Sequence, residues 1–292
     1  MAVDTLVKLV VEPLTYSFMQ RGLVASVLVG IVCAVIGTFV VLRGLSFIGD
    51  ALAHAVLPGI AVSFLAGQNI FIGAFIAGTL TALGIGVVQR YARLREDSAI
   101  GIMFVGTFAL GIALLSRIRS FSVDLAHILF GNVLAVSTEE VWMVAAFGLL
   151  VLAVIAFLYK ELVLVSFDPV MAATMRLPVT WLNNILLVLL SLTIVLSLRT
   201  VGNVLVVAML IAPAATAYQL TDHLPRMMGL AALFGAVSAI LGLYASYWWD
   251  VASGASIVLV SVILFFAVLF LTRRTAALTA ARATSESVGQ SF

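Results

Sequence analysis

Charged side chains are scarce in this sequence. Only 10% of its 292 residues are charged, 64% are hydrophobic, and the mean hydropathy is +1.25. A soluble domain usually carries about 25% charged residues, so this chain lacks the polar side chains needed to cover a water-facing surface. The composition excludes an ordinary soluble protein and predicts an integral membrane protein. The net charge of +2 is too small to indicate nucleic acid as a partner.

Lysine and cysteine are rarer still. Lys8 and Lys160 are the only lysines, and neither follows a glycine-rich loop, so the phosphate-binding motif GxxxxGK[ST] is absent. The single cysteine, Cys33, excludes an intrachain disulfide. CxxC, HExxH and an evident Ser-His-Asp grouping are also missing. The sequence therefore gives little support for an enzyme, and any ATP-driven work requires a separate ATPase subunit.

Long apolar runs make up most of the chain. Their length and continuity favour helices over the alternating strands of a membrane barrel. We predict an all-α, polytopic helical bundle with nine spans, in a range of eight to ten because only RTVGN separates two of them. The expected spans are 22–42, 47–66, 70–89, 99–116, 141–159, 181–198, 201–219, 227–248 and 255–271.

A single membrane domain is expected over residues 21–274. Residues 1–20 lack the features of a cleaved signal and are predicted to be an interfacial segment, and residues 275–292 are predicted to be a disordered tail. The connecting loops divide the Lys and Arg residues ten against five. The positive-inside rule places the richer set of loops and the C-terminus in the cytoplasm, with the N-terminus outside.

The stretch GDALAHAVLPGIAVSFL (49–65) carries two ionisable residues in an apolar run. Asp50 and His54 are four residues apart, so on a helix their side chains face the same way. A carboxylate oxygen and an imidazole nitrogen at this spacing can bind one divalent cation. Ionisable groups inside membrane segments usually mark an ion or proton path, so we expect metal ligands here. The alternative is a mutually paired cap near the lipid headgroups.

Pro58 adds to this interpretation. It lacks the N–H that would bond to the carbonyl of residue 54, and a free carbonyl in a membrane helix is tolerated where it lines a cavity or an ion site. Pro213 has the same effect in the run 201–219, where a kinked packing helix is the better explanation. His127 could relay metal from a docked partner, but a short packed helix is the simpler interpretation. His223 lies at a predicted helix N-terminus and is not expected to be a ligand.

The longest cytoplasmic connection, residues 160–180, contains a short predicted helix. Asp168 and Pro169 suit an N-cap followed by the first helical position, and Pro178 ends the helix after about two turns. This helix could insert into the groove of a partner protein or lie on the membrane surface, and the sequence barely separates the two. The residues expected to form the contact are Asp168, Pro169, Val170, Met171, Met175 and Leu177.

Four blocks of sequence together carry a family resemblance: LRGLSFIGDALAHAVLPGIAVSFL (42–65), LFGNVLAV (129–136), FDPVMAATMRLP (167–178) and VGNVLVVAMLIAPAATAYQLTD (201–222). They resemble the permeases of the metal-uptake ABC transporters, the manganese, zinc and iron group. The resemblance implies a homodimer in the bacterial inner membrane, with a cytoplasmic ATPase on each protomer and an extracytoplasmic metal-binding protein that delivers one cation per cycle.

The resemblance also assigns roles to the residues singled out above. It implies that Asp50 and His54 match the intramembrane metal site of the family, and that the element at 168–178 is the coupling helix seated in the ATPase. Arg176 departs from the family pattern, because such permeases often carry Gly at this place. This departure puts the exact contact with the ATPase in doubt but does not change the assignment to this class of permease.

The leading hypothesis is a permease that imports a divalent transition metal by alternating access, with manganese favoured and zinc or iron as other candidates. The metal is cargo, so no permanently bound cofactor is expected, and a site with few protein ligands can release it. The alternative is a proton-coupled secondary cation transporter that needs no ATPase. A membrane enzyme or a receptor-like scaffold forms a third class, for which only the Asp50 and His54 pair offers support.

Overall fold

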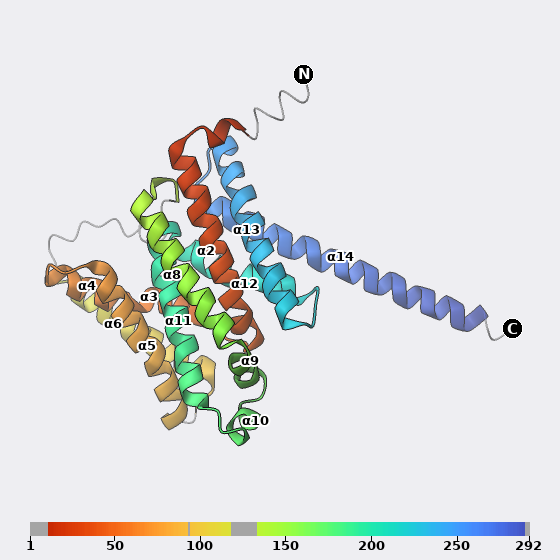
Figure 1. The fold of residues 1–292 in the computed structure, drawn as a ribbon, viewed down its shortest axis with the longest axis horizontal. Coiled ribbons are helices and arrows are strands. Elements are labelled where there is room, and N and C mark those ends of the chain that lie inside the picture. Colours follow the sequence, from red (N-terminus) through yellow and green to blue (C-terminus); the bar gives the residue numbers. More distant parts are fainter. Residues whose placement is uncertain (1–10, 93, 118–132, 290–292) are drawn as a thin grey trace.

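The computed structural model describes residues 11–92, 94–117 and 133–289, and the side chains of Arg199 and of 274–289 lie outside this description. Within the described ranges the regular structure is helical, without strands, as the sequence predicts (Figure 1). The helices are α2 (Ser17–Leu42), α3 (Ile48–Ala55), α4 (Leu57–Leu65), α5 (Ile70–Ala92), α6 (Glu96–Leu115), η1 (Val133–Ala135), α8 (Thr138–Phe157), α9 (Tyr159–Phe167), α10 (Pro169–Thr174), α11 (Val179–Val201), α12 (Asn203–Tyr218), α13 (Leu224–Trp249) and α14 (Ser253–Gly289).

The membrane-length helices correspond to the predicted spans. In the described residues, eight helical segments are long and apolar enough to cross a membrane, with α3 and α4 counted together as Ile48–Leu65. The predicted span at 201–219 corresponds to α12, which has 16 residues and is shorter than the others. The expected all-α, polytopic architecture is therefore confirmed.

The second span differs from the expected continuous helix. It consists of α3 and α4, which meet at Val56, and Pro58 lies in the first turn of α4. Proline suits this position because the first N–H groups of a helix have no partner within it. The carbonyl oxygen of His54, which we expected to be free, faces the N–H of Val56. The proline thus begins a new helix and does not simply open a carbonyl inside an old one.

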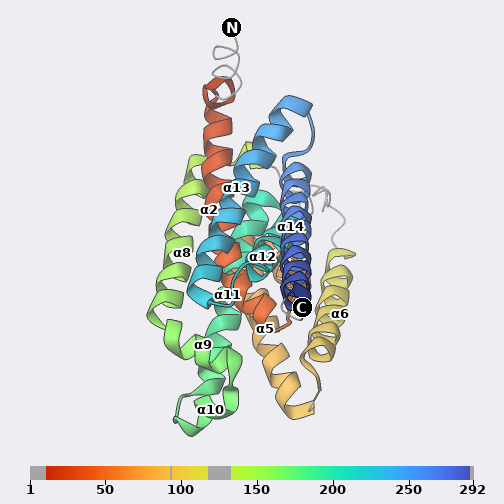
Figure 2. The ribbon, with the colours of Figure 1, turned by 90° about the vertical axis from the view of Figure 1, so that its right-hand side faces the viewer.

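Helix α2 lies at the centre of the bundle. It packs against α13, α12, α8 and α11, and Figure 2 shows it between α8 and α13. Gly37 of α2 lies directly against the backbone carbonyl of Leu210 in α12, where a Cβ atom would overlap that oxygen. Small residues allow such close approach between membrane helices, whose association depends on van der Waals packing because lipid gives no hydrophobic driving force.

The basic connections gather at one end of the bundle. The junctions between α2 and α3, α5 and α6, and α10 and α11 contribute to one cavity, and α9 and α10 lie at the lower end in Figure 1. Helix α14 begins at the opposite end and projects away from the bundle as far as Gly289. The bounds of α14 include most of the residues of the predicted tail, 275–292, and the disorder of that tail stays a prediction. Helix α2 already begins at Ser17, inside the segment predicted to be interfacial.

Gly37→Ala should lower the free energy of unfolding by about 1–3 kcal/mol, because the added methyl group forces α2 and α12 apart. Gly106→Ala is the matched control, since nothing lies within 4 Å of a Cβ atom at Gly106. Thermal unfolding of both purified variants in detergent measures the difference. Equal stability of the two variants would show that the close approach at Gly37 contributes nothing.

Candidate functional site

Helix α3 presents only two side chains that are not buried. Six of its eight residues are buried, and the remaining two are Asp50 and His54. The Asp50 side chain is 39% exposed and the His54 side chain 23%. Burial of the apolar residues thus orients the helix so that the acid and the imidazole share its one open face, as the four-residue spacing predicts.

The two side chains are in direct contact. The Nδ1 atom of His54 lies 3.5 Å from Oδ1 of Asp50 and 3.0 Å from the backbone carbonyl oxygen of the same residue. The shorter contact fits an Nδ1–H that donates to the carbonyl, and this tautomer leaves the lone pair of Nε2 free to bind a ligand. A backbone carbonyl that holds one ring nitrogen of a histidine while the other binds metal is a common arrangement in metal sites.

Two aromatic rings from α6 enclose the imidazole. Phe104 and Phe108 lie edge-to-face to His54, with ring centroids 5.8 and 5.7 Å away, and the two phenyl rings stack on each other. The stacked pair covers part of the imidazole with an apolar surface and restricts its rotation. The histidine is therefore held in one orientation by α6 and by the backbone of its own helix.

Asn203, the first residue of α12, completes the polar surroundings of His54. Its Nδ2 lies 3.4 Å from Nδ1 and 3.3 Å from Nε2 of the imidazole, and the residue is only 4% exposed. The preceding Gly202 has a φ of 82°, a conformation that glycine adopts without strain, and it turns the chain from α11 into α12. Sequence reasoning did not select Asn203. The sequence feature that could have pointed to Asn203 is its place directly after a glycine, at the start of an apolar run.

The described part of the chain contains no group of three or more His, Cys, Asp or Glu side chains able to hold a metal ion. Within that part of the chain, Asp50 and His54 are therefore a pair without a third His, Cys, Asp or Glu side chain beside them. His127 lies outside the described residues. His223 is exposed at the N-cap of α13, and Pro213 is buried inside α12, as expected for a residue of a packing helix.

The short helix predicted after Asp168 is present as α10. Oδ1 of Asp168 accepts a hydrogen bond of 2.8 Å from the N–H of Met171, and Pro169 occupies the first turn, as predicted. The helix is shorter than expected and ends at Thr174. Met175 caps its C-terminus.

The apolar residues of this element divide into two groups. Val170, Met171 and Met175 are 73%, 51% and 59% exposed, whereas Leu177 turns inward and packs against the core. Arg176 follows the helix with a φ of 60°, in the left-handed region. This region favours glycine, so Arg176 adopts the conformation at some cost in backbone strain.

Comparisons with known proteins agree with this arrangement. Residues 15–272 match the ABC 3 transport family. The chain belongs to this family. The manganese transport system membrane protein MntC of Halalkalibacterium halodurans is 53% identical over 266 residues, which covers 91% of each chain. The chelated iron transport system membrane protein YfeD of Yersinia pestis is 42% identical over 270 residues, or 91% of this chain and 89% of that protein.

A solved structure supports the same conclusion. A chain of PsaBC from Streptococcus pneumoniae, in complex with Fab, is 40% identical and has a TM-score of 0.81, with 96% of this chain and 100% of that chain covered. The protein is thus a multi-pass membrane permease subunit of a bacterial ABC transporter and not its ATPase. This membership argues against the secondary transporter that needs no ATPase.

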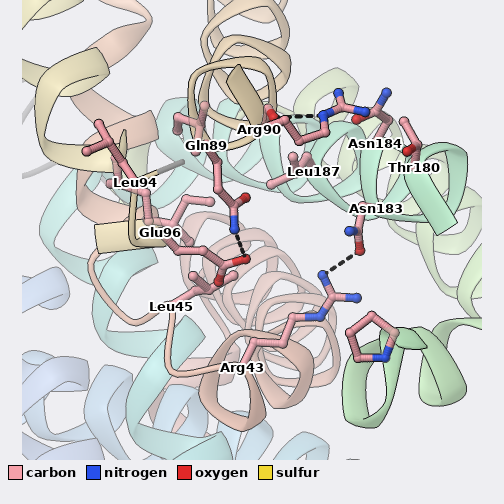
Figure 3. Close-up of a pocket in the computed structure, with 15 residues that line it drawn as sticks. Arg43, Leu45, Gln89, Arg90, Leu94, Glu96, Thr180, Asn183, Asn184 and Leu187 are labelled. Atoms are coloured by element: carbon pink, nitrogen blue, oxygen red, sulfur yellow. Dashed lines mark hydrogen bonds between the residues drawn. The ribbon is translucent and has the colours of Figure 1, made fainter. Parts of the chain in front are cut away.

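The permease has a polar cavity of about 460 Å³ at the end of the bundle where α10 lies (Figure 3). Its polar lining residues come from the α2–α3 and α5–α6 junctions and from the first turns of α11. They are Arg43, Gln89, Arg90, Glu96, Thr180, Asn183 and Asn184. Sequence reasoning counted the arginines for orientation and did not predict that these residues meet.

Arg43 joins three elements at this cavity. As the C-cap of α2, it donates from Nε to Oγ of Ser166 in α9 at 3.0 Å, and from one terminal nitrogen to Oδ1 of Asn183 in α11 at 2.9 Å. Burial lowers the pKa of the Arg43 guanidinium, and the nearby carboxylate of Glu96 opposes this effect. The guanidinium thus links the end of α2, just before α3, to the last turn of α9, just before α10, and to α11.

Replacing Arg43 with alanine should lower the free energy of unfolding by about 1.5–3 kcal/mol, because Asn183 and Ser166 lose hydrogen bonds to a charged group. Arg90→Ala is the control. Its Nε bonds only to the Gly86 carbonyl of its own helix, and exposed substitutions of this kind change stability by about 0.5 kcal/mol or less. Thermal unfolding of the purified permease compares the two. A smaller loss for Arg43→Ala than for Arg90→Ala would contradict the linking role.

Proposed function

We propose that this permease imports a divalent transition metal, manganese in the first place and iron as the second candidate, through a site formed by Asp50 and His54. The observation that carries the proposal is that α3 buries every side chain except this acid and this imidazole. The names of the relatives MntC and YfeD, which refer to manganese and to chelated iron, support the choice of cargo. Zinc stays the third candidate, as the sequence predicts.

The chemistry of the pair suits a site that must release its cargo. Nε2 of His54 offers one nitrogen ligand, and the Asp50 carboxylate, which has no Lys or Arg ion-pair partner in the described residues, offers oxygen and a negative charge. Few protein ligands leave room for retained water and limit affinity. Alternating access then needs only a moderate change in the surroundings of α3 to let the cation leave on the cytoplasmic side.

The energy for this change comes from a partner ATPase in our proposal. Val170, Met171 and Met175 form an exposed apolar face at the tip of the bundle, and such a face fits a hydrophobic groove in a partner protein. PsaBC, to which the related solved chain belongs, is named for more than one component. We also propose that two permeases form a homodimer and that an extracytoplasmic metal-binding protein delivers the cation, as the family resemblance implies.

Asp50→Asn and His54→Ala should each abolish metal uptake, because each removes one of the two strong ligands. Both side chains are partly exposed, so the variants should remain in the membrane with the ATPase bound. Uptake of manganese by metal-limited cells and co-purification of the complex check the two expectations. Wild-type uptake in either variant would remove Asp50 and His54 from the transport site.

Val170→Asp and Met171→Asp should each weaken co-purification of the ATPase, because a carboxylate placed in an apolar groove loses its hydration. Val251→Asp is the matched control. Val251 is also an exposed apolar residue, at 45%, but it lies between α13 and α14 at the other end of the bundle. An ATPase that stays bound to both α10 variants would place the docking contact elsewhere.

A further inference from the structure

We propose that Asn203 is a third protein ligand of the transported cation, binding through its side-chain oxygen Oδ1, and that it biases the site toward manganese over zinc. This inference rests on the proposed function and deepens it, since it adds a neutral oxygen donor from a second helix to the Asp50 and His54 pair. Without Asn203, both donors would come from a single turn of α3.

The position of Asn203 is built into the fold. The chain leaves α11 at Val201, turns at Gly202 with a φ of 82°, and begins α12 with this amide. Asn203 is 4% exposed and lies against the imidazole of His54, although 149 residues separate the two in sequence. A buried amide at a helix start that faces a histidine is placed by tertiary packing between α3 and α12, which are in contact.

The side-chain amide of Asn203 has poor hydrogen bonding in its present position. Its Oδ1 is buried and has no hydrogen-bond partner among the residues that the structure describes. Its Nδ2 is almost equidistant from the two ring nitrogens of His54, at 3.4 and 3.3 Å, so it cannot point along the lone pair of either one. Buried polar atoms in folded proteins nearly always have a partner, and an orphaned atom calls for an explanation such as a missing ion.

A bound cation resolves this mismatch. The Asn203 amide lies beside the imidazole, with Nδ2 3.3 Å from Nε2, so a rotation of the side chain can bring Oδ1 toward a cation bound at Nε2. The lone pair of Nε2 is free for that cation when Nδ1–H donates to the Asp50 carbonyl. A cation at Nε2 binds the imidazole and the amide oxygen together, so the orphaned acceptor gains a partner.

The resulting donor set has a chemical preference. Carboxylate and carbonyl oxygens suit manganese, whereas imidazole and thiolate suit zinc, and intrinsic affinity at an equivalent site otherwise favours zinc. An amide oxygen shifts a site made of one carboxylate and one imidazole toward the oxygen-preferring metal. Its neutrality also avoids a second negative charge, which would bind the cargo more tightly and slow its release.

The test uses equilibrium binding to the purified permease–ATPase complex. Free Mn²⁺ is measured by electron paramagnetic resonance during titration, and Zn²⁺ is added as a competitor. Asn203→Leu, which keeps the approximate size and removes the oxygen, should weaken Mn²⁺ binding by about tenfold or more and Zn²⁺ binding by less. Asn203→Asp retains an oxygen and should bind Mn²⁺ at least as tightly as the unaltered complex.

Controls separate ligation from positioning. Asn184→Leu makes the same substitution in the polar cavity and should leave the preference between Mn²⁺ and Zn²⁺ unchanged. If Asn203 only positions His54, Asn203→Leu lowers binding of both metals by the same factor, and the proposal is overturned. If Asn203→Leu fails to fold, Asn203→Asp decides: a folded complex of this variant that has lost Mn²⁺ binding overturns it, and retained binding supports it.

The same titration distinguishes this inference from the proposed function. Normal Mn²⁺ binding by Asp50→Asn and His54→Ala would show that the cation does not bind at this site, and would overturn both the proposed function and the third ligand. Loss of binding in those two variants, together with an unchanged metal preference in Asn203→Leu, would overturn the third ligand alone.

Discussion

Two ionisable groups in an apolar membrane segment have to be kept away from lipid, and this constraint organises the region around α3. A charged group at the centre of a bilayer costs several kcal/mol, at least about 2.5 on insertion scales. Helix α3 buries its six apolar and small residues against neighbouring helices and leaves Asp50 and His54 on its open face. There the two side chains contact each other, and Asn203 and the phenyl rings of α6 lie against His54, so the imidazole has a polar partner and a restricted orientation.

The Asp50 and His54 pair and the cavity at the α10 end share helix α3, because Ile48 lines the cavity and the pair follows it by two and six residues. Asn183, beside Arg43, lies in the first turns of α11, and Asn203 follows the last turn, so the rise of the helix places them about 27 Å apart. Two elements join these levels: α11 itself, and the α2–α3 connection that begins at Arg43. Gly37 of α2 packs directly against the backbone of Leu210 in α12, so α2 reaches this connection as one of a closely packed pair of helices.

The sequence predicted some parts of the site and missed others for identifiable reasons. A four-residue spacing on a helix is a local property, so the shared face of Asp50 and His54 followed from sequence alone. The break after α3 was missed because Pro58 is compatible both with a kinked helix and with the first turn of a new one. Leu177 was expected on the docking face. It turns inward because the left-handed Arg176 redirects the chain, and no local pattern indicated that conformation.

The sequence by itself determined the membrane class, the all-helical architecture, the approximate spans and the pairing of acid with imidazole, because hydropathy and helical periodicity act within one segment. Only the tertiary structure decided which helices meet that pair, and so brought Phe104, Phe108 and Asn203 to His54 and gathered the polar cavity around Arg43. Contacts between helices that are far apart in sequence depend on how closely their backbones can approach. A small residue such as Gly37 allows a close approach, but the sequence alone does not tell which helix, here α12 at Leu210, will pack against it.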